Sequence, residues 1–188
     1  MEKWGIGLFL AAAISLGFAA QATAGTAVAF KASYSGTNTL ALFSFDGNLA
    51  GIFTYGEMGT FGQAMGQDVG ETAPDGNKCT VPGHTANAGT ESTLVGDSDI
   101  VRYSSTGDLQ YRKATSQTSC VDTSSGTPPF PFVDQGSGII IGGTGRFAGA
   151  SGNYTFSDSG TILSQPSAPG FGFFAGASGT VSGVVNLQ

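Results

Sequence analysis

The sequence predicts an all-β domain built from short antiparallel strands, and three observations support this fold class. The chain contains 31 glycines, and Ser and Thr are also frequent. Residues that favour helices occur only in short pieces, and both glycine and β-branched residues lower helix stability. Short β-rich or alternating segments recur between turns of Gly, Asn, Asp and Ser, a spacing typical of a sandwich or a barrel.

The first 24 residues are expected to form a signal peptide that is not part of the fold. A short charged start precedes the apolar run 4–20, and Ala22-Thr23-Ala24 places small residues where a signal peptidase cleaves. The alternative is an uncleaved anchor, because the run is near the lower length limit for spanning a bilayer. Cleavage leaves residues 25–188 as one secreted or periplasmic domain, with no membrane span in the mature chain.

Turn residues divide the mature chain into a series of candidate strands. Asp46-Gly47-Asn48 and Thr106-Gly107-Asp108 predict hairpin turns, because Gly, Asn and Asp tolerate positive φ. Two stretches, 68–87 and 119–138, are rich in turn-forming residues and are expected to be loops. The candidate strands are residues 27–34, 39–45, 51–55, 93–95, 100–104, 109–114, 138–141, 152–156, 160–164 and 179–185.

The two cysteines, Cys79 and Cys120, fall one in each of the expected loops. In an oxidising compartment an isolated pair most simply forms one disulfide. The alternative is a redox or metal site. However, no C-x-x-C is present, and His84 is the only histidine, whereas structural zinc takes four ligands. We therefore predict a disulfide and no metal site.

The charge of the chain argues against one class of partner. The formal net charge is −6, and charged residues make up only 11% of the sequence. A sparsely charged acidic surface repels phosphate backbones, so we do not expect nucleic-acid binding.

The glycine-rich segment 138–152, GIIIGGTGRFAGASG, contains a match to the dinucleotide fingerprint G-x-G-x-x-G/A. A dinucleotide loop needs a following helix, whose N-terminus faces the pyrophosphate. Here the following residues, which include Tyr154 and Phe156, alternate as a strand. We therefore expect a tight β turn and no cofactor.

A second glycine-rich segment repeats part of the first. Residues 145–152 read GRFAGASG and residues 172–179 read GFFAGASG, so the two differ at one position only. We interpret them as equivalent turns of one sheet, and two copies are too few for a solenoid. In this interpretation Phe147 and Phe174 are both buried.

The segment GGTGRFAGASG, residues 142–152, resembles the G-G-T-G-x-F-x-x-A-x-G signature of the dirigent proteins and of the wider allene oxide cyclase-like barrels. The earlier T-G-D-L-Q-Y, residues 106–111, resembles a strand that often precedes this signature in exported bacterial relatives. The resemblance covers about residues 99–164. It implies an eight-stranded antiparallel barrel of calycin type with an apolar cavity, often assembled as a homo-oligomer. The structural turn residues that carry it are Gly142, Gly143, Gly145, Phe147 and Gly152.

No catalytic set carries over with this resemblance, because the matching motif is structural. Adjacent strand residues face opposite sides, which separates Arg102 from Tyr103. If the barrel interior carries Leu and Tyr, then Tyr103 and Tyr111 point inward, with Asp99 or Asp108 near the mouth. The alternative is that both tyrosines are core aromatics. The weak catalytic candidates are Tyr103, Tyr111, Asp108 and Arg102.

Three functional hypotheses follow, and the one ranked last is an outer-membrane barrel, which the length suits but for which aromatic girdles are not evident. The first is a secreted barrel that binds a small apolar ligand, with isomerase, cyclase or dirigent-like activity left open. The second is a non-enzymatic exported structural or interaction module with a plugged barrel. A cavity lined with aromatic rings and a few convergent polar groups favours the first hypothesis, and an interior filled by Phe and Leu favours the second.

Overall fold

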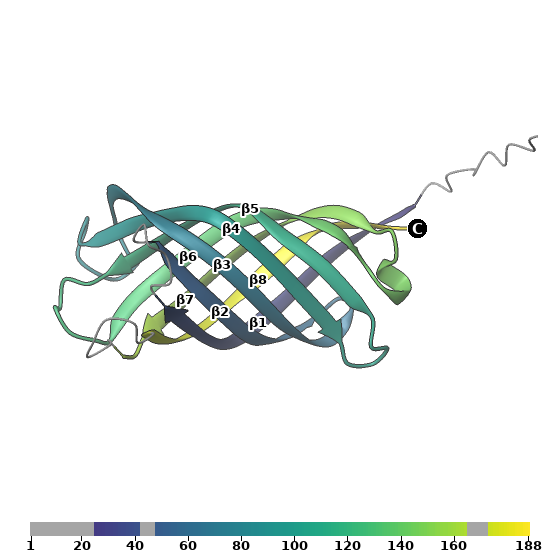
Figure 1. The fold of residues 1–188 in the computed structure, drawn as a ribbon, viewed down its shortest axis with the longest axis horizontal. Coiled ribbons are helices and arrows are strands. Elements are labelled where there is room, and N and C mark those ends of the chain that lie inside the picture. The colour runs from purple at the N-terminus through teal and green to yellow at the C-terminus, as the bar shows by residue number, and fades with distance from the viewer. Residues whose placement is uncertain (1–24, 42–47, 165–172) are drawn as a thin grey trace, which may run out of the picture.

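Eight antiparallel strands form one closed barrel in which each strand pairs with the next and the last pairs with the first (Figure 1). The computed structural model describes residues 25–41, 48–164 and 173–188. The predicted all-β class and the eight-stranded antiparallel barrel are confirmed. The strands are β1 (Thr26–Ala41), β2 (Leu49–Gly59), β3 (Gly62–Cys79), β4 (Gly89–Tyr103), β5 (Leu109–Asp122), β6 (Phe130–Gly143), β7 (Ser151–Ile162) and β8 (Phe173–Leu187).

Two features predicted at the N-terminal side fall partly or wholly outside the described residues. These are the signal peptide, residues 1–24, and most of the hairpin turn at 46–48. Residues 27–34 and 39–41 of the first two candidate strands belong to one long strand, since β1 runs without interruption to Ala41. The end of the second candidate, residues 42–45, is also outside the described residues.

The expectation of loops at 68–87 and 119–138 is wrong, because strands occupy most of both stretches. β3 continues to Cys79, and β5 and β6 leave only residues 123–129 between them. An irregularity in the register between Pro74 and Lys78 accommodates Pro and turn-forming residues without ending the strand. In β6, glycine leaves space inside the barrel, since a Cβ at Gly138 would collide with the ring of Tyr154. Turn-forming residues here serve strand packing.

The predicted β turn at the glycine cluster is confirmed, but the expectation that Gly152 belongs to this turn is wrong, because Gly152 lies in β7. Gly142 has a φ of 133°, and the three-residue 3-10 helix η1 (Gly145–Phe147) leads directly into β7. Gly143 is required for a different reason, because a Cβ there would collide with the carbonyl oxygen of Leu109 in β5. Phe147 is completely buried, as expected. The predicted hairpin at 106–108 is present as well, with Gly107 at a φ of 76° between β4 and β5.

The interpretation of the repeated segment as two equivalent turns is wrong. Residues 173–179 lie inside β8, and Phe174 faces outward with 44% of its surface exposed. The small residues suit a strand here because the chain must pack closely on both neighbours. A Cβ at Gly179, for example, would collide with the side chain of Asp158 in β7.

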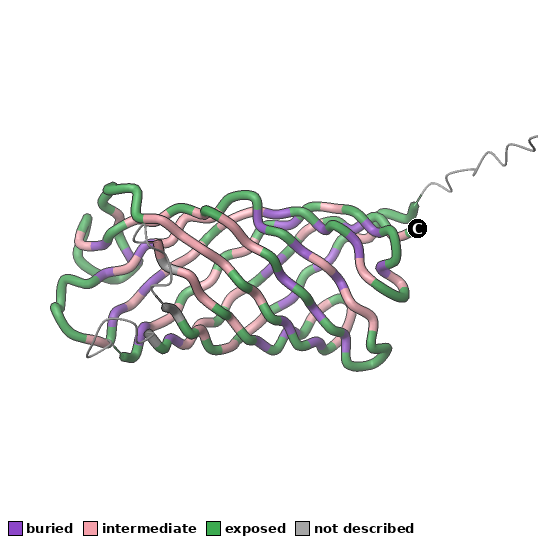
Figure 2. The backbone as a smooth tube through the Cα atoms, viewed as in Figure 1, coloured by how far each residue is buried: buried purple, intermediate pink, exposed green. Residues whose placement is uncertain are grey.

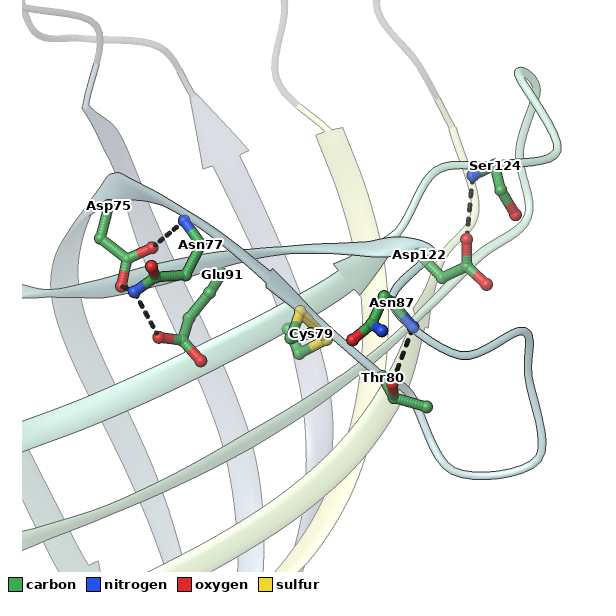
Figure 3. The surroundings of a disulfide bond; sticks show 9 residues. Asp75, Asn77, Cys79, Thr80, Asn87, Glu91, Asp122 and Ser124 are labelled. Atoms are coloured by element: carbon green, nitrogen blue, oxygen red, sulfur yellow. Dashed lines mark hydrogen bonds between the residues drawn. A yellow bond between two sulfur atoms is a disulfide. The ribbon is translucent and has the colours of Figure 1, made fainter.

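The predicted disulfide is confirmed. Cys79 at the end of β3 is bonded to Cys120 near the end of β5, and the two are 41 residues apart (Figure 3). The bond crosses β4, which lies between these strands. Closing a loop of this length stabilises the fold by about 4 kcal/mol in the chain-entropy model. The disulfide therefore secures one end of the barrel.

The barrel interior has an apolar cluster at each end. Buried and exposed residues alternate along the strands, as Figure 2 shows. At the end with η1, Phe147 stacks on Tyr103 with ring centroids 5.1 Å apart and fills the interior. At the disulfide end, Phe130, Phe132 and Ile162 form a second, smaller cluster. The section between them is polar. Among the described residues, no helix is long and apolar enough to cross a membrane.

We predict that Gly143→Val unfolds the barrel while Gly56→Val does not. Gly56 is exposed on β2, and a Cβ there meets nothing within 4 Å. At Gly56 the space is open and Val is a residue that strands favour. At Gly143 the Val side chain would collide with the backbone of β5. Urea unfolding is expected to show little change for Gly56→Val and the loss of several kcal/mol for Gly143→Val, a typical size for such a clash. A Gly143→Val protein as stable as the parent would contradict the argument.

Candidate ligand-binding cavity

A cavity of about 110 Å³ lies in the polar section of the barrel. Aromatic rings form part of its wall, and five aspartates form another part, with Arg112 as the only basic residue in the lining. The rings belong to Tyr34, Phe53, Tyr55, Phe132, Tyr154 and Phe156. The aspartates are Asp68, Asp97, Asp99, Asp134 and Asp158.

The alternation of side chains along each strand places these groups inside. On β4, Asp97 and Asp99 are in phase with Val101 and Tyr103, which are both buried. On β7, Asp158 is in phase with Tyr154, which is buried. A charged residue an even number of positions from a buried residue on the same strand therefore points into the same interior.

The ion pair between Arg112 and Glu57 lies beside the cavity and is almost fully buried. Arg112 donates two hydrogen bonds to the Glu57 carboxylate, at 2.8 and 3.0 Å, and each side chain is 3% exposed. Arg112 Nε also donates to Gln110 Oε1 at 2.7 Å. Burial lowers the pKa of Arg112, but the Glu57 carboxylate more than offsets this, and the pKa is raised well above its usual value. Arg112 is therefore charged and already paired.

Two pairs of aspartates face each other across neighbouring strands. Asp68 on β3 is directly opposite Asp99 on β4, and Asp134 on β6 is directly opposite Asp158 on β7. Like charges in directly opposite positions destabilise a sheet. In all four side chains the Oδ1 atom is buried and accepts no hydrogen bond. An interior built for stability alone would not place them there.

One member of each aspartate pair receives a hydrogen bond from a tyrosine. Tyr55 Oη donates to Asp99 Oδ2 at 2.7 Å, and Tyr34 Oη donates to Asp158 Oδ2 at 2.7 Å. These bonds hold one oxygen of each carboxyl group and orient the other. The Asp97 carboxylate accepts from the backbone N–H of Ala114.

Burial raises the pKa of the four facing aspartates. For Asp68 the pKa rises to about 10, with hydrogen bonding and charge repulsion from Asp97 adding to the effect of burial. For Asp134 burial and the charge of Asp158 raise the pKa to about 7. Burial raises the pKa of both Asp99 and Asp158 to about 6, against the opposing effects of Arg112 and the tyrosine hydroxyls. At neutral pH the empty cavity therefore holds protons on part of its carboxyl groups.

The structure does not bring the four predicted catalytic candidates together. Tyr103 points inward and is 1% exposed, but it packs in the plugged end. The expectation that Tyr111 points inward is wrong, because Gln110 and Arg112 take the buried positions of β5 and leave Tyr111 on the outward face. Arg102 is exposed on the outward face of β4.

Asp108 lies in the β4–β5 hairpin and not among the cavity residues. Its Oδ2 atom is 3.4 Å from Arg146 Nε, so the two groups form an ion pair at the plugged end. The Arg146 guanidinium also lies 4.7 Å from the centre of the Tyr103 ring. This arrangement supports the end plug.

Sequence reasoning identified one of the five cavity aspartates, Asp99, and placed it near the mouth. Asp68 and Asp134 lie in stretches that were expected to be loops, and Asp158 lies between two candidate strands. Their alternation with buried aromatic residues on the same strand could have identified them. On β6, Phe130, Phe132 and Asp134 are two residues apart and therefore face the same side. The same spacing relates Asp158 to the aromatic residues of β7.

The described residues contain no group of three or more His, Cys, Asp and Glu side chains that could hold a metal ion. In comparisons with family models, curated proteins and solved structures, no match to this chain was found. The resemblance to dirigent and allene oxide cyclase-like barrels stays a prediction, and so does the homo-oligomer.

We predict that Arg112→Met destabilises the barrel by about 3–5 kcal/mol, because it leaves Glu57 as an unpaired buried charge. The exposed Arg102→Met on β4 is the matched control and is expected to have little effect. Combining Arg112→Met with Glu57→Leu is expected to recover much of the loss, because no buried charge is then left without its partner. Urea unfolding measures all three, and equal losses for Arg112→Met and Arg102→Met would contradict the account.

We also predict that the empty barrel is more stable in mild acid than in mild base. In the unfolded chain an aspartate has a pKa of 3.8, whereas aspartates of the cavity have a higher pKa in the folded barrel. Between the two pKa values the folded state binds a proton that the unfolded state has released. The free energy of unfolding therefore falls as the pH rises toward the folded-state pKa. For Asp99, Asp134 and Asp158 this loss of stability takes place between pH 3.8 and about pH 7.

The expected loss from these three groups together is on the order of 5 kcal/mol between about pH 5 and about pH 8. Urea unfolding at the two pH values measures it, and Asp134→Asn is expected to reduce the difference. A stability that rises over this range would show that the aspartates ionise normally.

Proposed function

We propose that this chain is a small-molecule-binding barrel and that the ligand occupies the polar section of its interior. The observation that supports this most is the cavity itself, which combines aromatic walls with several convergent polar groups. Binding sites for small molecules commonly have this composition, and eight strands enclose an interior of a size that takes one small ligand.

A second cavity of about 100 Å³ adjoins the first and extends the proposed site. The two share Asn38, Asp68, Gln117, Phe132 and Asp134 in their linings, which indicates that they are continuous. The second cavity is also lined by Thr72, Ser92, Val121 and Ile162, at the end of the barrel that carries the disulfide.

The two ends of the barrel have different roles in this proposal. Phe147 and Tyr103 stack and fill the interior at the η1 end, where both are at most 1% exposed. The ligand therefore enters from the disulfide end, through the second cavity. A fully plugged structural module would need no such space between two apolar clusters, so the cavity favours ligand binding over that alternative.

The apolar ligand expected from the family resemblance would match only the aromatic part of the cavity lining. The rings provide apolar contacts, but five aspartates line the same space. We therefore propose a ligand with both an apolar and a polar part. Isomerase, cyclase or dirigent-like activity stays a prediction. Asp134, whose pKa is about 7, is the side chain best suited to proton transfer in such a reaction.

We predict that Ala177→Leu abolishes ligand retention and leaves the barrel folded. Ala177 lines the first cavity, and a larger side chain would fill space that the ligand needs. Ser178→Leu is the matched control, because Ser178 is the next residue on β8 and is exposed. Native mass spectrometry of protein recovered from an expressing culture is expected to show a bound small molecule for the parent and the control only. Equal retention in all three would place the ligand outside the cavity, and a bare parent that also gives no thermal shift with a broad panel of small molecules would contradict the proposal.

A further inference from the structure

We propose that the ligand is a small organic cation, a protonated amine or a quaternary ammonium group, held between the two facing aspartate pairs and the aromatic rings of the cavity. This inference rests on the proposed function, since it names the chemical class that the proposed site takes. Four observations carry it, and they concern charge, unpartnered oxygen atoms, aromatic rings and size.

The first observation is an imbalance of charge. Five aspartates line the cavity and Arg112 is the only basic residue among the lining groups. Arg112 is already engaged by Glu57 in a bidentate pair. Its distance to Asp99 Oδ2 is 4.0 Å, the longest of its ion-pair contacts. The remaining carboxyl groups have no counter-charge within the cavity, so a cation is the ligand that completes the site.

The second observation is a set of buried acceptor atoms without donors. Asp99 is only 9% exposed and its Oδ1 atom accepts no hydrogen bond, although the residue lines the cavity. The Oδ1 atoms of Asp68, Asp134 and Asp158 are also buried and accept no hydrogen bond. Leaving a buried acceptor unpaired is costly, more so when it is charged. An ammonium group supplies both the hydrogen-bond donors and the charge that these oxygens lack.

The third observation is the ring wall between the aspartate pairs. Tyr34, Phe53 and Tyr55 pack against one another, with centroids 5.1 to 6.1 Å apart. Tyr154 and Phe156 form a second group, with centroids 6.3 Å apart. The faces of aromatic rings attract cations, and the same rings bury hydrocarbon. Such a wall suits an organic cation better than a hydrated metal ion.

The barrel already uses one of these rings in this way. The Arg112 guanidinium lies 6.0 Å from the centre of the Tyr154 ring and 5.7 Å from that of Phe30. A cation in the cavity would extend a contact that the protein makes with its own side chain.

The fourth observation is size. A cavity of about 110 Å³ takes only a few atoms beyond the charged group, and the adjoining cavity of about 100 Å³ takes a short tail. An anionic ligand would be repelled by the aspartates. A purely hydrocarbon ligand would leave the four Oδ1 atoms unpaired. The chemistry therefore favours a short amine with an apolar tail.

Binding of such a cation is expected to release protons. Burial holds protons on part of the aspartates in the empty barrel, and a cation stabilises the ionised forms. Affinity should therefore rise as the pH rises. The titratable or charged groups that face Asp134 are Asp158 on β7 and, through Asp158, Tyr34 on β1. Those that face Asp68 are Asp97 and Asp99 on β4, with Arg112 on β5 and Tyr55 on β2 beyond Asp99.

The experiment compares probes of equal shape and different charge, by isothermal titration calorimetry of the mature protein. One set is phenethylamine, 2-phenylethanol and phenylacetate, and a shorter set is butylamine, butan-1-ol and butyrate. In at least one set the amine is expected to bind about tenfold or more tightly than the alcohol, because charge-assisted contacts are the stronger ones. The carboxylate is expected not to bind. Titration in buffers of different ionisation enthalpy is expected to show proton release on amine binding.

Asp134→Asn with Asp158→Asn tests which side chains recognise the charge. The double variant is expected to lose the preference for amine over alcohol. It is also expected to be more stable than the parent in the empty state, because it removes facing like charges. A purely structural role for the pair would give the opposite change in stability. Asp75→Asn, an exposed position on β3, is the control for removal of negative charge and should leave binding unchanged.

The outcomes separate this inference from the proposed function. If the alcohol or the carboxylate binds as tightly as the amine, the cation inference is wrong, but the proposed function as a small-molecule-binding barrel is still supported. If none of the six probes binds, the cation inference is again wrong, and the retention experiment with Ala177→Leu decides the proposed function independently. An amine preference that persists in the double Asn variant would also overturn the assignment to Asp134 and Asp158.

Discussion

The buried ion pair between Arg112 and Glu57 is the contact on which the arrangement of the barrel interior depends. β2 and β5 are not neighbours in the sheet, so the pair joins them across the interior. It lies between the apolar plug around Phe147 and the open cavity. It engages the only basic group of the cavity lining, which makes just one longer contact of 4.0 Å with Asp99. The other four aspartates of the lining therefore have no partner of opposite charge. The acidity of the cavity follows from this one pairing.

Such an interior lowers stability, and other features of the fold offset that loss. The facing aspartates repel each other when ionised, and protonation in the empty barrel relieves part of that repulsion. A closed ring of strands leaves no unpaired edge, and the Cys79–Cys120 disulfide secures one end of the barrel. The apolar plug secures the opposite end. The apolar clusters and the disulfide thus lie toward the two ends of the barrel, and the polar section, where we propose that the ligand binds, lies between them.

The fold class, the disulfide and the glycine turn could be predicted from the sequence because each depends on local chemistry. Gly142 and Gly145 sit at positive φ, which a turn pattern reveals. The cavity could not be predicted, because its residues occur in segments rich in Gly, Ser and Asp that also describe loops. The decisive information is the phase of Asp134 and Asp158 relative to aromatic residues on the same strands. Which face is the inner one depends on barrel closure, and for this reason Tyr111 was expected inside while Arg112, its neighbour, occupies that position.

In the proposed binding site, buried carboxyl groups without a counter-charge stay protonated until a cation binds. The most direct measurement is the pH dependence of the side-chain carboxyl ¹³C resonances of the aspartates in the empty protein, assigned by single Asn substitutions. The account predicts that Asp68 and Asp134 titrate well above the usual range, with a pKa of about 10 and about 7, and that adding an amine at neutral pH moves both to the ionised position. Normal titration of both groups near 3.8, unaffected by the amine, would contradict it.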